Sequence, residues 1–402
     1  CIRDRITGGA THLLDTGTDS RIDVTSLTSF TDTNGNRSSL IAPTQGGEVD
    51  MPLLTSLTSV DLTLDATGSV STSQISQFEF GRLSVNGQHI DLSGLLDMSN
   101  SDLEIRGGAT ADISNVADIN GASFEVFDGV TLTVPVPTAY AAGSDTNTAF
   151  RANGPGSVLD LSSLTTLSGG GFIRTMFIDA EMGGFVDLSG LTEITGGATH
   201  MLADGAGSLV DVTALTTFTD TNGNRSSLIS PTQGGTVDAP LLTTLTSVDV
   251  TIDPMGTFAT SQMTSYTSGA MSVTGTHVDL NVLTNFSNSA LSLAGGATAG
   301  LPNVTAINGA SFVVEGGVTL SLPNATAYTG QSNNNTRFEA RGAGTRLDLS
   351  ALTTMSGGSF ISTLFIEAAD GGVVDLSGLQ QITGGATNIR AEEMASSVDL
   401  SA

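Results

Sequence analysis

The 402-residue chain carries 13 basic and 40 acidic residues, which gives a formal net charge of −27. Every basic residue is an arginine, and a surface this acidic repels nucleic acid and anionic membranes while it attracts cations. A single cysteine excludes an internal disulfide framework, and no apolar run approaches the roughly 20 residues of a membrane helix. We therefore expect neither a nucleic-acid partner nor a membrane span.

A long internal repeat organises the sequence. The segment FTDTNGNRSSLI occurs at 30–41 and again at 218–229, and ITGGAT begins at Ile6, Ile194 and Ile382. All of these intervals are 188 residues. The chain therefore contains two complete modules, 6–193 and 194–381, and a partial third module at 382–402.

Each module divides into eight shorter repeats that begin with a motif of the type VDLSGLTEI. One full set of eight motifs begins at Val186, Val210, Val237, Phe258, Val278, Ala299, Leu320 and Leu347, and Val374 begins the next set. The spacings are 24, 27, 21, 20, 21, 21, 27 and 27 residues, which together make 188.

The short repeat predicts β-strands. Apolar and polar residues alternate, as in Val-Asp-Leu, and a break of small residues precedes a second apolar pair. A third alternation follows, for example Phe312 and Val314 before a glycine pair. This pattern predicts two or three strands of 3–5 residues per repeat, bounded by turn-forming residues. Helix is disfavoured because β-branched residues and glycine dominate.

A repeat this short cannot bury its own apolar residues, so successive repeats must stack. We predict an all-β fold, a right-handed parallel β-helix (β-solenoid) of about 17 turns that runs as one continuous solenoid over 1–402. Eight turns at ~4.8 Å give a module of about 38 Å. The side chains predicted to point inward are Val186, Leu188, Leu191, Ile194 and their equivalents.

Strings of coils such as VDLSGLTEITGG at 186–197 resemble the repeat regions of large secreted bacterial surface proteins. More distantly, the pattern is similar to the parallel β-helix of polysaccharide lyases and secreted adhesins. The resemblance covers the whole chain and implies a pectin-lyase-like architecture and an extracellular or cell-surface setting, but it transfers no catalytic residue. A leucine-rich-repeat horseshoe is the competing solenoid, and its asparagine-bearing signature is absent.

Threonine recurs at the seventh position of the motif. We predict a ladder of hydroxyls that bond to the neighbouring coil, in preference to an ice-binding surface. The column comprises Thr192, Thr216, Thr243, Thr264, Thr284, Thr305, Thr326 and Thr353.

Two groups of oxygen-bearing residues are candidates for binding calcium, the one cofactor that the sequence suggests. The first is a column of carboxylates at the second position of the motif, in successive turns, formed by Asp160, Asp187, Asp211 and Asp238. Stacked carboxylates repel one another unless water or a cation intervenes, so solvated side chains and a cation ladder are both open. The second group is the duplicated loop, with Asp32, Asn34 and Asn36 in one copy and Asp220, Asn222 and Asn224 in the other. This spacing is similar to the start of a calcium loop, although the later glycine and acid of such loops are missing.

No catalytic residue is predicted, because no acid–base cluster recurs in both modules and the histidines are isolated along the chain. We expect a non-enzymatic, extracellular structural protein that forms a fibre, filament or adhesin stalk. The alternative is a carbohydrate-binding or carbohydrate-cleaving β-helix protein, with cell-surface polysaccharide as the partner. An exposed solenoid end presents unpaired backbone groups, so we also expect self-association, end to end or within one giant chain.

Overall fold

The computed structural model describes residues 4–34, 39–223 and 226–401. The chain divides into two compact units, Cys1–Thr213 and Ala214–Ala402. Each unit is a stack of parallel β-coils, about 16 turns in all, and the described residues contain no helix. None of them therefore forms a helix long and apolar enough to cross a membrane.

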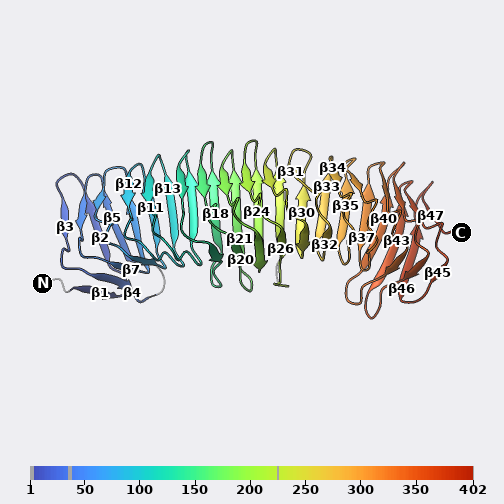
Figure 1. The fold of residues 1–402 in the computed structure, drawn as a ribbon, viewed down its shortest axis with the longest axis horizontal. Coiled ribbons are helices and arrows are strands. Elements are labelled where there is room, and N and C mark those ends of the chain that lie inside the picture. Colours follow the sequence, from blue (N-terminus) through green and yellow to red (C-terminus); the bar gives the residue numbers. More distant parts are fainter. Residues whose placement is uncertain (1–3, 35–38, 224–225, 402) are drawn as a thin grey trace. The chain divides into compact units, whose positions relative to one another are not determined.

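Each coil contributes one longer strand to a parallel sheet, which we call the long sheet of its unit (Figure 1). In the first unit its strands are β2 (His12–Thr16), β5 (Ser39–Thr44), β8 (Val60–Leu64), β11 (Arg82–Asn86), β13 (Asp102–Arg106), β15 (Ser123–Phe127), β18 (Thr148–Asn153), β21 (Met176–Glu181) and β24 (Thr199–Asp204). In the second unit they are β27 (Ser227–Thr232), β30 (Val248–Ile252), β33 (Ala270–Thr274), β35 (Ala290–Ala294), β37 (Ser311–Glu315), β40 (Thr336–Arg341), β43 (Thr363–Ala369) and β46 (Ala386–Ala391).

A short strand that carries the Val-Asp pattern follows each long strand. In the first unit these are β3 (Arg21–Asp23), β6 (Glu48–Asp50), β9 (Ser69–Val70), β12 (His89–Asp91), β14 (Thr110–Asp112), β16 (Thr131–Thr133), β19 (Val158–Asp160), β22 (Phe185–Asp187) and β25 (Leu209–Asp211). In the second unit they are β28 (Thr236–Asp238), β31 (Thr257–Phe258), β34 (His277–Asp279), β36 (Thr298–Gly300), β38 (Thr319–Ser321), β41 (Arg346–Asp348), β44 (Val373–Asp375) and β47 (Ser397–Asp399).

A third strand completes most coils before the chain turns into the next long strand. In the first unit these are β1 (Arg5–Gly8), β4 (Ser29–Asp32), β7 (Ser56–Thr58), β10 (Gln77–Glu79), β17 (Ala139–Ala141), β20 (Thr166–Gly169) and β23 (Glu193–Gly196). In the second unit they are β26 (Thr217–Thr219), β29 (Thr244–Thr246), β32 (Ser265–Thr267), β39 (Ala327–Thr329), β42 (Thr354–Ser356) and β45 (Gln381–Ile382).

The core of each unit consists of apolar side chains stacked coil on coil. Val186, Leu188, Leu191 and Ile194 are fully buried, which confirms the predicted inward set. Within each unit, register brings like residues together, because long strands of neighbouring coils pair in parallel at equivalent residues, as β21 does with β24 and β37 with β40. In the second unit the rings of Tyr266, Phe286, Phe312 and Phe338 follow one another at 5.5, 5.5 and 6.0 Å between centroids.

The predicted threonine ladder is present at the turn before the third strand. Thr243 Oγ1 donates to the carbonyl of Thr216 at 3.3 Å, and Thr264 Oγ1 donates to the carbonyl of Thr243 at 3.3 Å. In the first unit Thr192 Oγ1 donates in the same way to Thr165 at 3.0 Å. These hydroxyls satisfy backbone acceptors of the preceding coil and so tie the coils together.

Candidate functional site

The predicted carboxylate column lies at the ends of the short strands. Asp160, Asp187 and Asp211 are direct register partners on β19, β22 and β25 of the first unit. Asp238 occupies the same place at the end of β28 in the second unit. Neighbouring coils of a parallel sheet are ~4.8 Å apart, so these three carboxylates of the first unit stand one above another.

One oxygen of each column carboxylate is used in the turn that follows it. Oδ1 of Asp160, Asp187 and Asp211 accepts a bond from the main-chain N–H two residues later, at 3.1, 2.9 and 3.0 Å. This is an Asx turn, which aspartate forms well. Within the described residues no group of three or more His, Cys, Asp or Glu side chains is placed to hold a metal ion. Calcium binding by the column stays a prediction, and it would depend on the remaining oxygens.

The same turn recurs along both units and lowers the pKa of several of its aspartates. The hydroxyl and the main-chain N–H of the serine two residues later lower the pKa of three aspartates below its ordinary value, because both donors favour the charged carboxylate. These are Asp91 with Ser93, Asp112 with Ser114 and Asp399 with Ser401. The aspartates therefore act as charged turn-formers in the coil.

The duplicated loop contains a buried aspartate that closes the loop on itself. Asp32 Oδ1 accepts from the N–H of Asn34 at 2.8 Å, and its Oδ2 accepts from Ser39 Oγ at 2.8 Å. In the second unit Asp220 makes the same two bonds, with the N–H of Asn222 at 2.7 Å and with Ser227 Oγ at 2.8 Å.

Only 3% of Asp32 and 5% of Asp220 is exposed, so these carboxylates need their internal donors. The demanding geometry of this buried pair gives a structural reason for the two identical copies of the loop. Of the predicted calcium-loop residues, Asn36 and Asn224 lie outside the described residues, and a cation at either loop stays a prediction.

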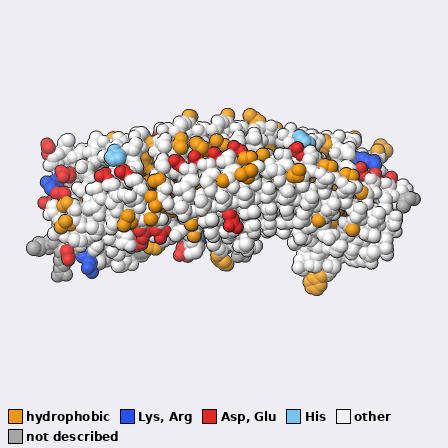
Figure 2. All heavy atoms as spheres, viewed as in Figure 1, with side chains coloured by type: hydrophobic (Ala, Val, Ile, Leu, Met, Phe, Trp, Pro, Cys, Tyr) orange, Lys and Arg blue, Asp and Glu red, His pale blue; other side chains and the backbone are white. Residues whose placement is uncertain are grey.

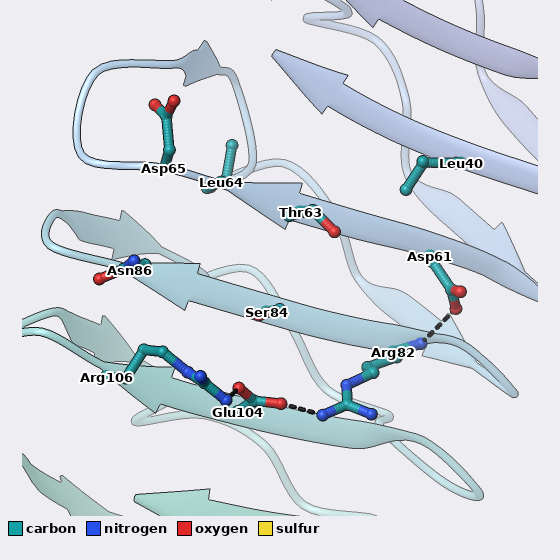
Figure 3. Close-up of a pocket in the computed structure, with 10 residues that line it drawn as sticks. All are labelled: Leu40, Asp61, Thr63, Leu64, Asp65, Arg82, Ser84, Asn86, Glu104 and Arg106. Carbon is teal, nitrogen blue, oxygen red and sulfur yellow. Dashed lines mark hydrogen bonds and ion pairs between the residues drawn. The ribbon is translucent and has the colours of Figure 1, made fainter. Parts of the chain in front are cut away.

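The outward face of the long sheet holds a feature that the sequence analysis missed. In the first unit a hollow of about 600 Å³ is lined by residues of β5, β8, β11 and β13 and by Asp65 just after β8. Glu104 lies at its edge, where one oxygen pairs with Arg82 and the other with Arg106 (Figure 3). Arg82 also donates its main-chain N–H to Asp61 at 2.9 Å. Glu104 is only 4% exposed because the two arginine side chains cover it.

Two further carboxylates on the outward faces of the long sheets are buried under arginines. Asp179 in the first unit pairs with Arg151 at 2.8 Å. Glu339 in the second unit pairs with Arg337 and Arg341, each at 2.8 Å.

The pKa values of these two buried carboxylates shift in opposite directions. Burial raises the pKa of Asp179, and one guanidinium does not offset it. Burial also acts to raise the pKa of Glu339, but the guanidiniums of Arg337 and Arg341 outweigh burial and hold the pKa below its ordinary value.

The arginine–carboxylate groups on the long sheets are not repeated from one module to the next, whereas the Asx turns of the short strands occur in both modules. The positions 188 residues after Arg82, Glu104 and Arg106 hold Ala270, Ser292 and Ala294. On the face seen in Figure 2, acidic side chains form small separate groups among uncharged polar ones. Charged residues spaced two apart on a strand, as in Glu-Ile-Arg at 104–106, were the available sequence signal, because period two places them on one face.

Two histidines also form hydrogen bonds between neighbouring coils. His89 Nδ1 lies 2.8 Å from Thr110 Oγ1 in the first unit, and His277 Nδ1 lies 2.7 Å from Thr298 Oγ1 in the second. Each pair joins neighbouring coils through equivalent positions of the two modules.

In comparisons with known proteins, neither a family model nor a curated protein matches this sequence. The fold is therefore the firmest ground for a functional argument, and the likeness to secreted surface proteins stays an expectation.

Proposed function

We propose that the chain is a non-enzymatic structural protein of the cell exterior, in which stacked β-coils form a fibre, a filament or an adhesin stalk. The observation that carries this proposal is that the side chains of the recurring polar residues form hydrogen bonds within their own coil or to a neighbouring coil.

Three recurring devices support this reading. The aspartates of the short strands form Asx turns, as Asp187 does with the N–H of Ser189. The threonines bond to carbonyls of the preceding coil, as in the pair of Thr243 and Thr216. The buried aspartates of the duplicated loops are held by serines of their own loops. A chain whose repeated chemistry maintains coil stacking is suited to a mechanical or spacing role.

The charge of the chain fits an exposed setting. A net charge of −27 keeps a large surface soluble and separates neighbouring copies laterally. A single cysteine cannot form a disulfide within the chain, so hydrogen bonds and side-chain packing hold the coils together. We also propose that further modules assemble within one long chain or end to end, and the constant pairing of equivalent residues within each unit supports this.

Two experiments test the proposal. Brief protease treatment of intact source cells is expected to release fragments of this chain, and complete protection until lysis would contradict the external location. The purified chain is expected to release no reducing ends and no unsaturated sugars from a panel of neutral and acidic polysaccharides. Turnover of any member would favour the carbohydrate-cleaving alternative.

A further inference from the structure

Two consecutive coils in each unit carry a long loop just before the long strand. In the first unit these paired loops span 142–147 and 170–175, and in the second unit they span 330–335 and 357–362. They are fastened to each other, because Asn147 Oδ1 accepts from the N–H of Thr175 at 3.0 Å and Asn335 Oδ1 accepts from the N–H of Thr363 at 2.9 Å. In Figure 1 the paired loops of the second unit project from the corner below β40 and β43.

The coils that precede the paired loops turn the same corner tightly, so a groove forms where the tight corner meets the first loop. In the first unit a cavity of about 280 Å³ lies between the loop at 143–146 and a corner made by Ser59, Phe80 and Asn100. In the second unit a cavity of about 240 Å³ occupies the equivalent place, between Ser268 and Asn288 on one side and Gln331 on the other.

The backbone of this corner is left-handed in every tight coil. Ser59, Phe80 and Asn100 have φ of 57°, 57° and 54°, and the equivalent Ser268 and Asn288 have 61° and 56°. Asparagine tolerates this conformation, but a bulky aromatic residue rarely adopts it. Phe80 nevertheless occupies such a position with 47% of its surface exposed at the groove. Strained and exposed residues of this kind gather at binding sites.

The lining of the groove is polar and almost uncharged. In the first unit it offers the hydroxyls of Ser59, Ser144 and Thr146, the amide of Asn100 and the single carboxylate of Asp145 around the ring of Phe80. In the second unit the lining combines amides, among them Asn288, Asn334 and Asn335, with serine and threonine hydroxyls and the single carboxylate of Asp249. Neither lining contains an arginine or a histidine.

We propose that this groove binds a neutral polysaccharide, at one site in each module. A sugar ring presents hydroxyls around its edge and C–H groups on its faces. Amide, hydroxyl and carboxylate groups can bond to the hydroxyls, while the exposed aromatic ring covers a C–H face. The volumes fall at or below the ~300–1,000 Å³ of enclosed small-molecule sites, so each groove would hold a short segment of a longer chain.

Other ligand classes fit less well. An anionic polymer would meet a lining without cations on a chain of net charge −27. A peptide would need an open sheet edge or apolar pockets for its side chains, and this groove offers one aromatic ring. The site in the first unit should be the stronger one, because the second unit has Ser268 where the first has Phe80.

The chain itself supplies the variants for a test. Phe80→Ser installs the residue of the second module, and Ser268→Phe makes the reciprocal change, both at backbones of nearly equal φ. Met182→Asp is the matched control. It replaces another exposed left-handed apolar residue by its counterpart Asp370, at a corner away from the groove. Each protein is run on native gels that contain graded amounts of soluble β-1,4-glucan, β-1,3-glucan or galactomannan, with polygalacturonate as the anionic arm.

At least one neutral gel is expected to retard the wild-type chain and the Met182→Asp variant equally. Phe80→Ser should weaken this retardation roughly tenfold, and Ser268→Phe should strengthen it. No retardation in any neutral gel, retardation only in polygalacturonate, or retardation that Phe80→Ser leaves unchanged would each overturn the proposal. This binding site is a property in addition to the proposed structural role. A negative result here would not affect that role, which is tested separately by protease treatment of cells and by the polysaccharide turnover assay.

Discussion

The buried carboxylates of the two long sheets provide a paired test of how this protein holds charge. Glu339 and Asp179 are 4% and 2% exposed, on equivalent outward faces, but the first has two arginine partners and the second has one. Glu339→Gln removes the charge that both guanidiniums face. Bonds to charged groups contribute ~1.5–3 kcal/mol each, and the half-exposed arginines reduce this by solvent screening. We therefore expect a loss of about 1–3 kcal/mol in the local free energy of unfolding.

Asp179→Asn should behave differently. Burial raises the pKa of Asp179, so the folded protein disfavours its charge, and an asparagine retains an oxygen for Arg151. The expected change is smaller than for Glu339→Gln, within about 1 kcal/mol, because the cost of burying the Asp179 charge offsets much of what its pair with the partly exposed Arg151 contributes.

Native-state hydrogen exchange by mass spectrometry, read at β40 for one variant and at β21 for the other, reports each coil separately. About tenfold faster exchange corresponds to 1.4 kcal/mol. Equal acceleration in both variants would refute the argument that the number of arginines decides the outcome.

The remaining predictions concern pH, the duplicated loop and cations. The pKa of Glu339 is lowered on folding, so its stabilisation is complete above the unfolded value near 4.3 and is lost as the pH falls through the folded value. The protection of the β40 amides, expressed relative to the intrinsic exchange rate at each pH, should therefore fall in acid, and protection that does not change with pH would contradict this. Ser39→Ala and Ser227→Ala each remove a donor from a buried aspartate, so both should cost about 1–3 kcal/mol locally, and a neutral effect on exchange near the two loops would argue against the closure described above. Millimolar calcium should raise the melting temperature more than sodium chloride of equal ionic strength, and Asp187→Asn, which keeps the turn acceptor, should reduce the difference; identical melting in both salts would leave the column as solvated carboxylates.

The sequence predicted the fold because its periodicities are simple. Alternation at Val186 and Leu188 and the repeat of eight coils per 188 residues require stacked parallel strands, and the structure places those side chains in the core. The Asp and Thr columns were also predictable, since residues at equivalent positions of successive coils must become neighbours.

The outward groups could not be predicted in the same way. The bond between Asp32 and Ser39 depends on how a loop folds back over seven residues, and no periodicity encodes that distance. The groove beside Phe80 arises where a tight corner and a long loop fall in nearby coils. The 27-residue repeats indicate where the long loops lie, but they do not give the space between a loop and the neighbouring corner. The pairing of Glu104 with two arginines needs both the register and the side-chain directions.

Electron microscopy of the native material, labelled with an antibody to this chain, tests the structural role most directly. If the modules stack coaxially, as the sequence predicts, the label should decorate fibres or stalks and recur about every 38 Å, from eight coils at ~4.8 Å. Label confined to discrete particles of about the mass of one chain, 40.7 kDa, would contradict the account.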